Sequence, residues 1–259
     1  MSYPFRLLNT GRHDAFYNMG FDEALLERVS AGESPPVLRC YGWKPAAVSI
    51  GYFQKLEEEV DIAACARYGV DLVRRISGGG AVFHHEEITY SLIMPLSHPL
   101  AASSIMESYG TLCAGLTAAL GLLGIEAVFA PINDILAGKG AGRKKISGNA
   151  QTRRQGCVLQ HGTVLLDLDP ALMFTLLRVP QEKLKGKLID DIRARVTGLY
   201  TLLGRKIPFE EAAAAMAGGF KKALALEYVS KEISAWPEEQ RALVLAKEKF
   251  AAPKWLNRR

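Results

Sequence analysis

The sequence lacks the features that define several classes of protein. No run approaches the roughly 18 apolar residues of a membrane-spanning helix, and the start, Met1 to Arg6, lacks the apolar segment of a signal peptide. There is no internal repeat, no low-complexity tract and no long linker rich in proline, glycine and serine. We therefore expect a soluble, cytoplasmic protein without membrane contact, in which residues 1–259 form a single domain.

Cysteine is scarce and widely spaced, which argues against a disulfide framework and against a zinc site. The four cysteines, Cys40, Cys65, Cys113 and Cys157, form no C-x-x-C pair and no cluster with histidine. Cys113 falls on the apolar stripe of a predicted helix, so we expect it in the core. Cys157 begins a predicted strand, where a structural thiol is favoured over a nucleophile. Cys40 and Cys65 have no neighbours that suggest a lowered pKa.

The net charge of +5 and the pI near 9.0 indicate a mild basic excess. A positive surface favours an anionic partner such as a nucleotide or an acidic protein, and ordinary surface lysines explain it equally well. No helix-turn-helix pattern is present, and we expect no nucleic-acid partner.

Hydrophobic periodicity predicts an α+β fold, because strands and helices mix without βαβα regularity and helices dominate the end. We expect strands near 5–9, 36–41, 46–50, 70–75, 87–94, 127–129, 145–147 and 158–166, with 36–41 and 46–50 paired across the turn at 42–45. We expect helices at 14–30, 54–68, 103–123, 171–177, 188–203, 209–225 and 237–249, including a helical C-terminal segment at about 205–250.

A glycine triplet, Gly78 to Gly80, follows the strand predicted at 70–75. Glycine permits positive φ and a close approach of backbone to ligand, so its N–H groups can meet phosphate or carboxylate oxygens. Arg74 and Arg75 precede the loop, and strand alternation places them on opposite faces, so that one can face an anion. The loop fits neither a dinucleotide fingerprint nor a P-loop. A plain turn is the alternative.

A second polar group comprises Asn133-Asp134 and the basic run that leads into Lys145. Such runs are usually solvated turns, but Lys145 precedes a stretch of small and apolar residues that is typical of a strand entering the interior. A lysine there can meet several oxygens while negative charge builds up during attack on a phosphate. Asp134 could hold Mg²⁺ together with phosphate oxygens, or serve as an orienting carboxylate. His161, inside an apolar strand, is more often a structural residue than a catalyst.

These motifs, in this order, resemble the lipoate–protein ligase and octanoyltransferase family, which is related to the catalytic domain of biotin–protein ligases. The resemblance rests on RRISGGGAVFH at 74–84, ND at 133–134, GRKKISGNAQ at 142–151 and HGT at 161–163. It implies an α+β domain with a mixed, bent sheet flanked by helices and a cleft for lipoic acid and ATP.

The resemblance also implies roles for individual residues. Lys145 would be catalytic, holding the carboxylate-derived oxygen and the α-phosphate, and Asp134 would hold Mg²⁺. The nucleotide and acyl chain would be bound by Arg75, Gly78, Gly79, Gly80, Ala81, Val82, Phe83, Asn133, Lys145 and His161. The implied acceptors are the lipoyl domains of 2-oxoacid dehydrogenases or the glycine cleavage H protein.

Two branches of the family remain open from the motifs. Residues 84–91 and 159–162 resemble the octanoyltransferases, which move octanoyl from acyl carrier protein through a cysteine thioester without ATP. Residues 124–135, where that branch keeps its nucleophile, contain no cysteine. The sequence therefore favours an ATP-dependent lipoate–protein ligase. A non-catalytic binder is a third alternative, and the presence of Lys145 argues against it.

The length of the chain resembles that of two-component ligases, in which a small separate protein replaces the accessory domain found in many single-chain ligases. We therefore expect no accessory domain here, and weak adenylation by this chain alone that a small accessory subunit restores.

Overall fold

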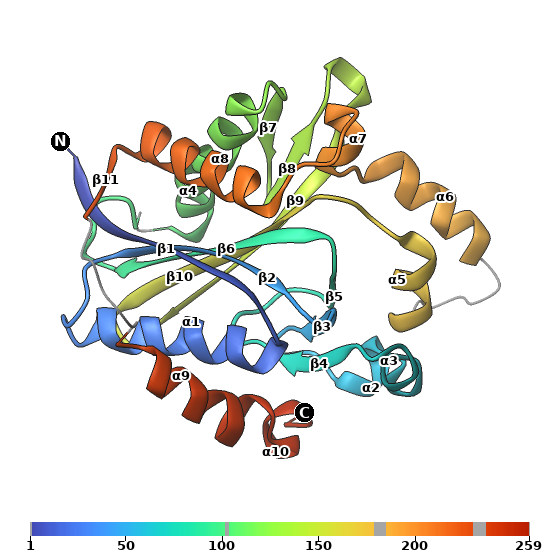
Figure 1. The fold of residues 1–259 in the computed structure, drawn as a ribbon, viewed down its shortest axis with the longest axis horizontal. Coiled ribbons are helices and arrows are strands. Elements are labelled where there is room, and N and C mark those ends of the chain that lie inside the picture. The colour runs from blue at the N-terminus through green and yellow to red at the C-terminus, as the bar shows by residue number, and fades with distance from the viewer. Residues whose placement is uncertain (1, 102–103, 179–184, 230–236, 259) are drawn as a thin grey trace.

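The computed structural model describes residues 2–101, 104–178, 185–229 and 237–258, and the side chains of 185–188 are outside this description. Two sheets and a set of flanking helices form the fold (Figure 1), which confirms the predicted α+β class. Within the described residues, no helix is long and apolar enough to cross a membrane.

The larger sheet is mixed and has eight strands in the order β11-β1-β2-β6-β10-β9-β8-β7. Its strands β1 and β2 are parallel, as are β1 and β11, and the other neighbours are antiparallel. The bounds are β1 (Tyr3–His13), β2 (Val37–Trp43), β6 (Glu87–Pro95), β7 (Ala127–Ala130), β8 (Asp134–Ala137), β9 (Lys144–Arg154), β10 (Cys157–Leu165) and β11 (Leu226–Tyr228).

The smaller sheet has the order β4-β3-β5, formed by β3 (Ala47–Ile50), β4 (Asp71–Arg74) and β5 (Val82–His84). The predicted pairing of 36–41 with 46–50 is wrong, because β2 pairs with β1 and β6 whereas β3 pairs with β4 and β5. Every residue of β2 and β3 is buried. The sequence of a strand that is buried on both faces does not indicate which sheet the strand joins. The turn at 42–45 indicates only that the chain changes direction there.

Helices flank the sheets on both faces. They are α1 (Ala15–Ser30), α2 (Leu56–Glu59), α3 (Ile62–Tyr68), α4 (Ile105–Leu122), α5 (Pro170–Leu176), α6 (Lys185–Arg195), α7 (Leu199–Leu203), α8 (Phe209–Leu224), α9 (Glu239–Leu245) and α10 (Pro253–Leu256), with a 3-10 turn at Gly140–Gly142 and a π-helical turn at Ala246–Phe250. Helices α4 and α8 cover one face of the large sheet, α1 covers the other, and α9 packs on the outer side of α1 (Figure 1).

Two predicted helices are divided. The segment 54–68 breaks because the side chain of Asp61 caps α3 by accepting a hydrogen bond from the Ala64 amide at 2.8 Å. The segment 188–203 breaks between α6 and α7, where the Thr197 amide donates to the Lys145 carbonyl at 2.9 Å. Gly198 follows, and a Cβ there would lie 2.6 Å from the Leu166 carbonyl oxygen. The segment between α6 and α7 therefore packs closely against β9 and the end of β10.

The C-terminal segment is not purely helical, since β11 adds a parallel strand to β1 at one edge of the large sheet. Helix α9 packs on α1 at Gly20, where a Cβ would lie 2.5 Å from the Ala242 carbonyl oxygen. A buried ion pair between Arg6 of β1 and Glu238, with an N–O distance of 2.6 Å, joins the start of α9 to the large sheet. The end of the chain is thus packed into the main fold.

Candidate active site

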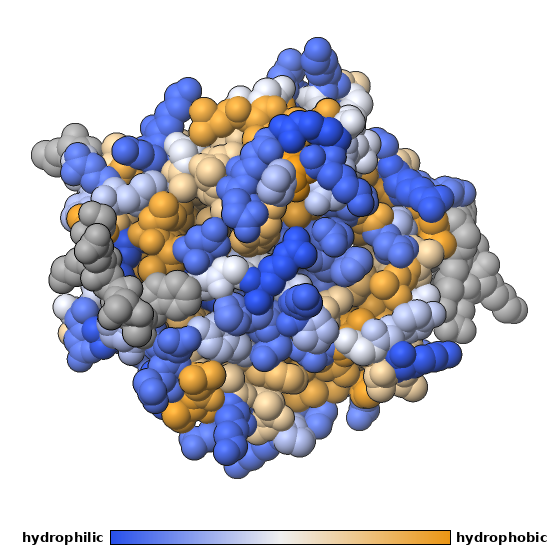
Figure 2. All heavy atoms as spheres, viewed as in Figure 1, coloured by the Kyte–Doolittle hydropathy of each residue, from blue (hydrophilic) through white to orange (hydrophobic). Residues whose placement is uncertain are grey.

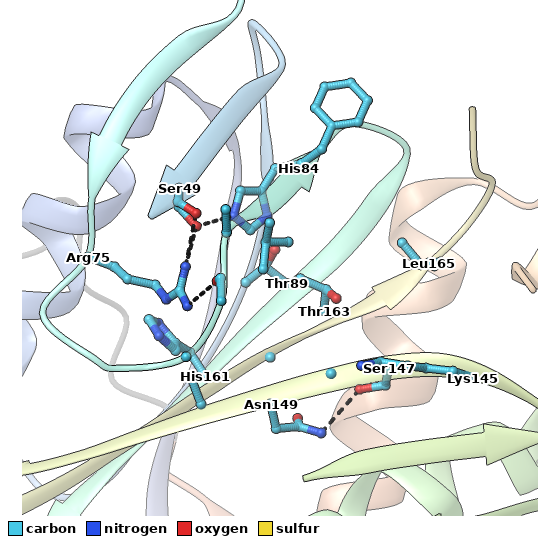
Figure 3. Close-up of a pocket in the computed structure, with 18 of the residues that line it drawn as sticks. Ser49, Arg75, His84, Thr89, Lys145, Ser147, Asn149, His161, Thr163 and Leu165 are labelled. Atoms are coloured by element: carbon cyan, nitrogen blue, oxygen red, sulfur yellow. Dashed lines mark hydrogen bonds between the residues drawn. The ribbon is translucent and has the colours of Figure 1, made fainter. Parts of the chain in front are cut away.

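A cavity of about 490 Å³ opens between the two sheets and helices α5 and α6. The glycine loop lies on one side, and the strands β9 and β10 lie on the other (Figure 3). Its lining residues are Met19, Tyr41, Trp43, Ser49, Arg75, Gly79, Gly80, Ala81, Val82, Phe83, His84, Thr89, Asn133, Lys145, Ile146, Ser147, Gly148, Asn149, Ala150, His161, Gly162, Thr163, Leu165, Leu168, Met173, Leu177, Ile192 and Val196. The cavity thus gathers most of the residues that the motifs single out.

Arg75 shapes the glycine-loop side of the cavity. Its guanidinium donates to the carbonyls of Gly78 at 2.9 Å and Gly80 at 2.7 Å, and to the carbonyl and hydroxyl oxygens of Ser49 at 3.0 Å each. Burial lowers the pKa of Arg75 to about 10, so it remains charged at neutral pH. Among the described residues, no carboxylate forms an ion pair with it. This side of the cavity therefore carries an uncompensated positive charge.

Arg74 points to the other side of the strand, as the alternation predicts. It is fully buried and donates to the carbonyls of Gly51, Tyr52, Gln54 and Leu256. The turn that begins at Gly51 in turn contacts the glycine loop, because a Cβ on Gly51 would lie 2.0 Å from the Gly79 carbonyl oxygen. The loop is therefore held from the cavity side by Arg75 and from the outside by the turn that Arg74 anchors.

Lys145 lies on the opposite wall, and a β-bulge orients it. The β8–β9 register pairs Ile135 with Ser147 but Leu136 with Lys145, so one residue of β9 is skipped. Since neighbouring side chains in a strand point to opposite faces, this extra residue turns Lys145 to the face occupied by Asp134. Lys145 Nζ lies 2.7 Å from Asp134 Oδ1, and the two side chains are 42% and 31% exposed.

Small residues and amides complete the Lys145 wall. A Cβ on Gly148 would lie 3.3 Å from Lys145 Cε and Nζ, so glycine leaves room for the ammonium group to move. Asn149 Nδ2 donates to the Asn133 carbonyl at 2.9 Å, Asn133 Nδ2 donates to the Asn149 carbonyl, and Tyr90 Oη donates to Asn149 Oδ1 at 2.8 Å. These bonds fix the segment before β8 against β9.

Two histidines line the cavity, and both ring nitrogens of each have partners. His84 lies 2.7 Å from Ser49 Oγ through Nε2 and 2.8 Å from Glu87 Oε1 through Nδ1. His161 lies 2.6 Å from Ser77 Oγ and 3.4 Å from Asp22 Oδ2. Burial lowers the pKa of His161, so its ring is neutral at pH 7. These contacts agree with the structural interpretation of His161, although its ring reaches the cavity wall.

The sequence motifs did not indicate the apolar end of the cavity. Its side chains come from β10, the loop after it, α5, α6 and the residue that follows each of these two helices, namely Leu165, Leu168, Met173, Leu177, Ile192 and Val196. In Figure 2, apolar residues lie among hydrophilic ones on the side of the molecule that carries α5 and α6. These residues all have types that are common in any protein core, so no local signal marks them as part of a binding site. Such a surface suits a hydrocarbon chain.

The predicted site residues are mostly brought together. Those on the lining are Arg75, Gly79, Gly80, Ala81, Val82, Phe83, Asn133, Lys145 and His161. Gly78 contributes through its carbonyl, which Arg75 holds, and is not on the lining. Asp134 reaches the cavity through its contact with Lys145. Ser49 also lines the cavity, but the sequence motifs did not single it out, although it lies only two residues before Gly51.

All four cysteines belong to the described part of the chain, and none lines the cavity. Each is at most 1% exposed. Burial raises the pKa of Cys40 and of Cys113 to about 12 and that of Cys65 to about 11, and it also raises the pKa of Cys157. Cys113 lies in the core, as its helical spacing predicts. At neutral pH the four side chains are therefore buried, protonated thiols.

A resident metal would have few protein ligands here. The described residues hold no group of three or more histidine, cysteine, aspartate and glutamate side chains that could bind a metal ion. Asp134 Oδ1 is buried and accepts no hydrogen bond, although it lies beside Lys145. One carboxylate oxygen of this kind fits Mg²⁺ only where phosphate oxygens and water supply the other ligands.

Known proteins similar to this chain share its length and fold. The chain is 37% identical to the octanoyltransferase LipM of Geobacillus kaustophilus and 38% identical to that of Kyrpidia tusciae, with 97% of this chain and 97% of each relative covered. A bi-partite lipoate protein ligase from Thermoplasma acidophilum superposes with a TM-score of 0.85 at 29% identity, over 98% of this chain and 96% of that chain. A lipoate-protein ligase A bound with ATP gives 0.78 at 28% identity, over 99% and 98%.

The family model for the lipoyl protein ligase A/B catalytic domain matches residues 14–221, which include the glycine loop, Lys145 and His161. Because that match spans most of the chain and the relatives are alike over nearly their whole length, this protein belongs to the lipoyl protein ligase A/B catalytic domain family.

Proposed function

We propose that this enzyme activates lipoate or octanoate with ATP and transfers the acyl group to a lysine of a lipoyl domain. The observation that carries the proposal is the choice of reactive groups on the cavity wall. Lys145 presents an ammonium group there, Arg75 adds an uncompensated charge, and none of the four cysteines reaches the lining. The cavity wall thus carries two cationic side chains and lacks a thiol nucleophile.

The chemistry fits these groups. A carboxylic acid acylates an amine at neutral pH only after its oxygen becomes part of a leaving group. Attack of the carboxylate oxygen on the α-phosphate of ATP gives the acyl-adenylate and pyrophosphate, and attack of the acceptor lysine on its carbonyl carbon releases AMP. In the first step the negatively charged carboxylate must approach the negatively charged α-phosphate. The ammonium group of Lys145 would reduce the repulsion between them and hold both groups in line.

The remaining residues would bind and orient the substrates. The amides of the glycine loop would bind phosphate or carboxylate oxygens, and the apolar end formed by residues such as Leu168, Met173 and Ile192 would receive the acyl chain and exclude water. Mg²⁺, bound to Asp134 and to phosphate oxygens, would supply further charge neutralisation.

A second candidate is octanoyl transfer from acyl carrier protein, and the relatives favour it. The octanoyltransferases LipM named above and that of Anoxybacillus flavithermus are 35–38% identical to this chain over 97% of it, whereas three lipoate ligase structures are 27–29% identical. The similarity to the octanoyltransferases LipM thus supports the transferase, and the absence of a cysteine from the cavity lining supports the ligase. We place the ligase first because a thioester forms only where a thiolate touches the acyl carbonyl.

The two candidates are separated by one pair of assays. The ligase predicts lipoate- or octanoate-dependent exchange of pyrophosphate into ATP, abolished in Lys145→Ala. The transferase predicts octanoyl transfer from acyl carrier protein without ATP, lost on Cys157→Ala or Cys113→Ala. Transfer without ATP together with an absence of exchange would replace the first candidate by the second.

We also propose two protein partners. The acceptor is a lipoyl domain, of a 2-oxoacid dehydrogenase or of the glycine cleavage H protein, and the Thermoplasma structure is described together with its E2 lipoyl domain. The second partner is a small accessory subunit, since this chain covers 96% of the matched chain of that bi-partite ligase. Adenylation by the isolated chain should be weak and should rise when such a subunit is added. A fully active isolated chain would contradict this second proposal.

A further inference from the structure

A line of hydrogen bonds connects a buried carboxylate to the glycine loop. Glu87 Oε1 lies 2.8 Å from His84 Nδ1, His84 Nε2 lies 2.7 Å from Ser49 Oγ, and Ser49 Oγ accepts from Arg75 at 3.0 Å. Arg75 then donates to the carbonyls at both ends of the glycine triplet. Figure 3 shows Ser49, His84 and Arg75 on one side of the cavity, across from Lys145.

The donors and acceptors give this line one direction. A carboxylate only accepts, so the proton of a neutral His84 must be on Nδ1, which donates to Glu87. The bare Nε2 must then accept, and its partner is the Ser49 hydroxyl. A guanidinium only donates, so Ser49 accepts from Arg75 and gives its own hydrogen to His84. Beginning at Glu87, the direction of each hydrogen bond thus determines the direction of the next one.

Glu87 is itself held in place. Thr89 Oγ1 donates to Glu87 Oε1 at 2.6 Å, and Trp43 Nε1 donates to Thr89 Oγ1 at 2.8 Å. The indole ring of Trp43 also stacks on His84, with ring centroids 4.0 Å apart and planes 15° apart. Glu87 is 1% exposed and is not on the cavity lining, so no substrate can touch it. Its influence on a ligand must pass through other residues.

We propose that Glu87 is a positioning residue that sets the shape of the glycine loop through His84, Ser49 and Arg75. By fixing the His84 tautomer it turns the Ser49 hydroxyl away from Arg75, so that the Ser49 oxygen remains an acceptor. Arg75, bound to Ser49 at one nitrogen, then holds the Gly78 and Gly80 carbonyls with the other. The loop amides keep one arrangement before substrate arrives, and binding does not have to order them.

The alternative tautomer shows why the carboxylate is needed. With a proton on Nε2, His84 would donate to Ser49, whose own hydrogen would have to turn elsewhere, in a site where Arg75 already donates to the same oxygen. Nδ1 would then face the Glu87 carboxylate without a proton between them, and two acceptors in contact repel each other. The Glu87 charge therefore selects a single pattern of bonds along the whole line.

The first test requires no substrate, so it is independent of the proposed function. Long-range ¹H–¹⁵N spectra of the full chain distinguish the two histidine tautomers, and we expect the proton of His84 on Nδ1. The amide resonances of Gly78, Gly79 and Gly80 should shift in both Glu87→Gln and Ser49→Ala. A proton on Nε2 in the native protein, or unmoved glycine amides in both variants, would overturn the proposal.

The second test uses the catalysed transfer, with whichever acyl donor proves active, and rests on the proposed function. Glu87→Gln and Ser49→Ala should each lower kcat/KM by about tenfold, mainly by raising KM. The double variant should have the same kcat/KM as the less active single variant, because both substitutions interrupt the same line of hydrogen bonds. Ser49→Thr, which keeps a hydroxyl, should retain most activity. Multiplying effects in the double variant would refute a shared path.

The matched control is Glu238→Gln, another fully buried glutamate, which pairs with Arg6 away from the cavity. It should lower thermal stability without shifting the glycine amides or KM. If Glu87→Gln does not fold, Ser49→Ala and Thr89→Val carry the amide-shift test, since each interrupts the same set of bonds. Failure to find any activity would reject the proposed function and leave the spectroscopic result to decide the positioning role.

Discussion

Lys145 Nζ lies 2.7 Å from Asp134 Oδ1 across the bulged β8–β9 pair, so the proposed catalytic cation is neutralised before a ligand arrives. Both side chains are partly exposed, and an ion pair of this kind contributes little to folding. The pair is therefore suited to exchange partners, with Lys145 turning to substrate oxygens. Gly148, beside the ammonium group, leaves it the space to do so.

The first prediction concerns Lys145. Lys145→Ala should lower kcat by about 100-fold or more, because the charge that stabilises the transition state is lost, while the free energy of unfolding changes by less than about 1 kcal/mol. Lys145→Arg should not restore the rate, since a planar guanidinium cannot replace a compact ammonium group. Steady-state kinetics and urea denaturation measure the two quantities.

The control for this variant is its neighbour in the sequence. Lys144 points away from the cavity and donates to the Arg193 carbonyl at 2.7 Å. Lys144→Ala should keep kcat within about twofold of the native value. An equal loss in both variants would mean that the general positive charge of this turn matters, and not the placement of Lys145.

The second prediction concerns the contact between Gly51 and the glycine loop. The Cβ of Gly51→Ala would lie 2.0 Å from the Gly79 carbonyl oxygen, so the backbone of the loop must move. We expect KM to rise by about tenfold or more and the free energy of unfolding to fall by about 1–3 kcal/mol, as in overpacked cores. Gly121→Ala, in helix α4 with open space around its Cβ, should be neutral or stabilising. An unchanged KM in Gly51→Ala would show that the loop does not depend on this contact.

The third prediction concerns the thiols. Since all four are buried and none lines the cavity, the native protein at pH 8 should react with less than one equivalent of iodoacetamide, and denaturation should expose all four. Cys157→Ala should keep full adenylation activity. Rapid modification of one thiol, accompanied by loss of transfer activity, would instead support the octanoyltransferase.

The fourth prediction concerns stability at alkaline pH. Burial raises the pKa of Cys40 and of Cys113 to about 12, from 9.0 in the unfolded chain. The folded state thus holds both protons more tightly, and this contribution is complete below pH 9 and is lost as the pH rises towards 12. Each thiol should lower the free energy of unfolding by up to about 1.4 kcal/mol per pH unit in that range. Urea denaturation at pH 8, 9 and 10 measures the slope, which should be shallower in Cys113→Ala.

Local patterns were sufficient for some elements and insufficient for others. The stripe of apolar residues that includes Leu116 and Leu120 predicted α4, because one helix face buries them. The strands 36–41 and 46–50 were found, but their pairing was wrong, since a strand buried on both faces does not reveal its neighbours. The break before α7 was missed because it depends on a contact with Lys145, about 50 residues away in the sequence.

The sequence by itself determined the α+β class, the glycine loop with arginines on two faces, and the presence of Lys145 beside an Asn-Asp pair, because these follow from residue type and strand alternation. Only the tertiary structure decided that a bulge turns Lys145 towards Asp134, that Glu87 is linked to Arg75 through His84 and Ser49, and that α5 and α6 close an apolar end. Those relations join side chains from separate strands and helices, and their register and packing depend on the assembled core.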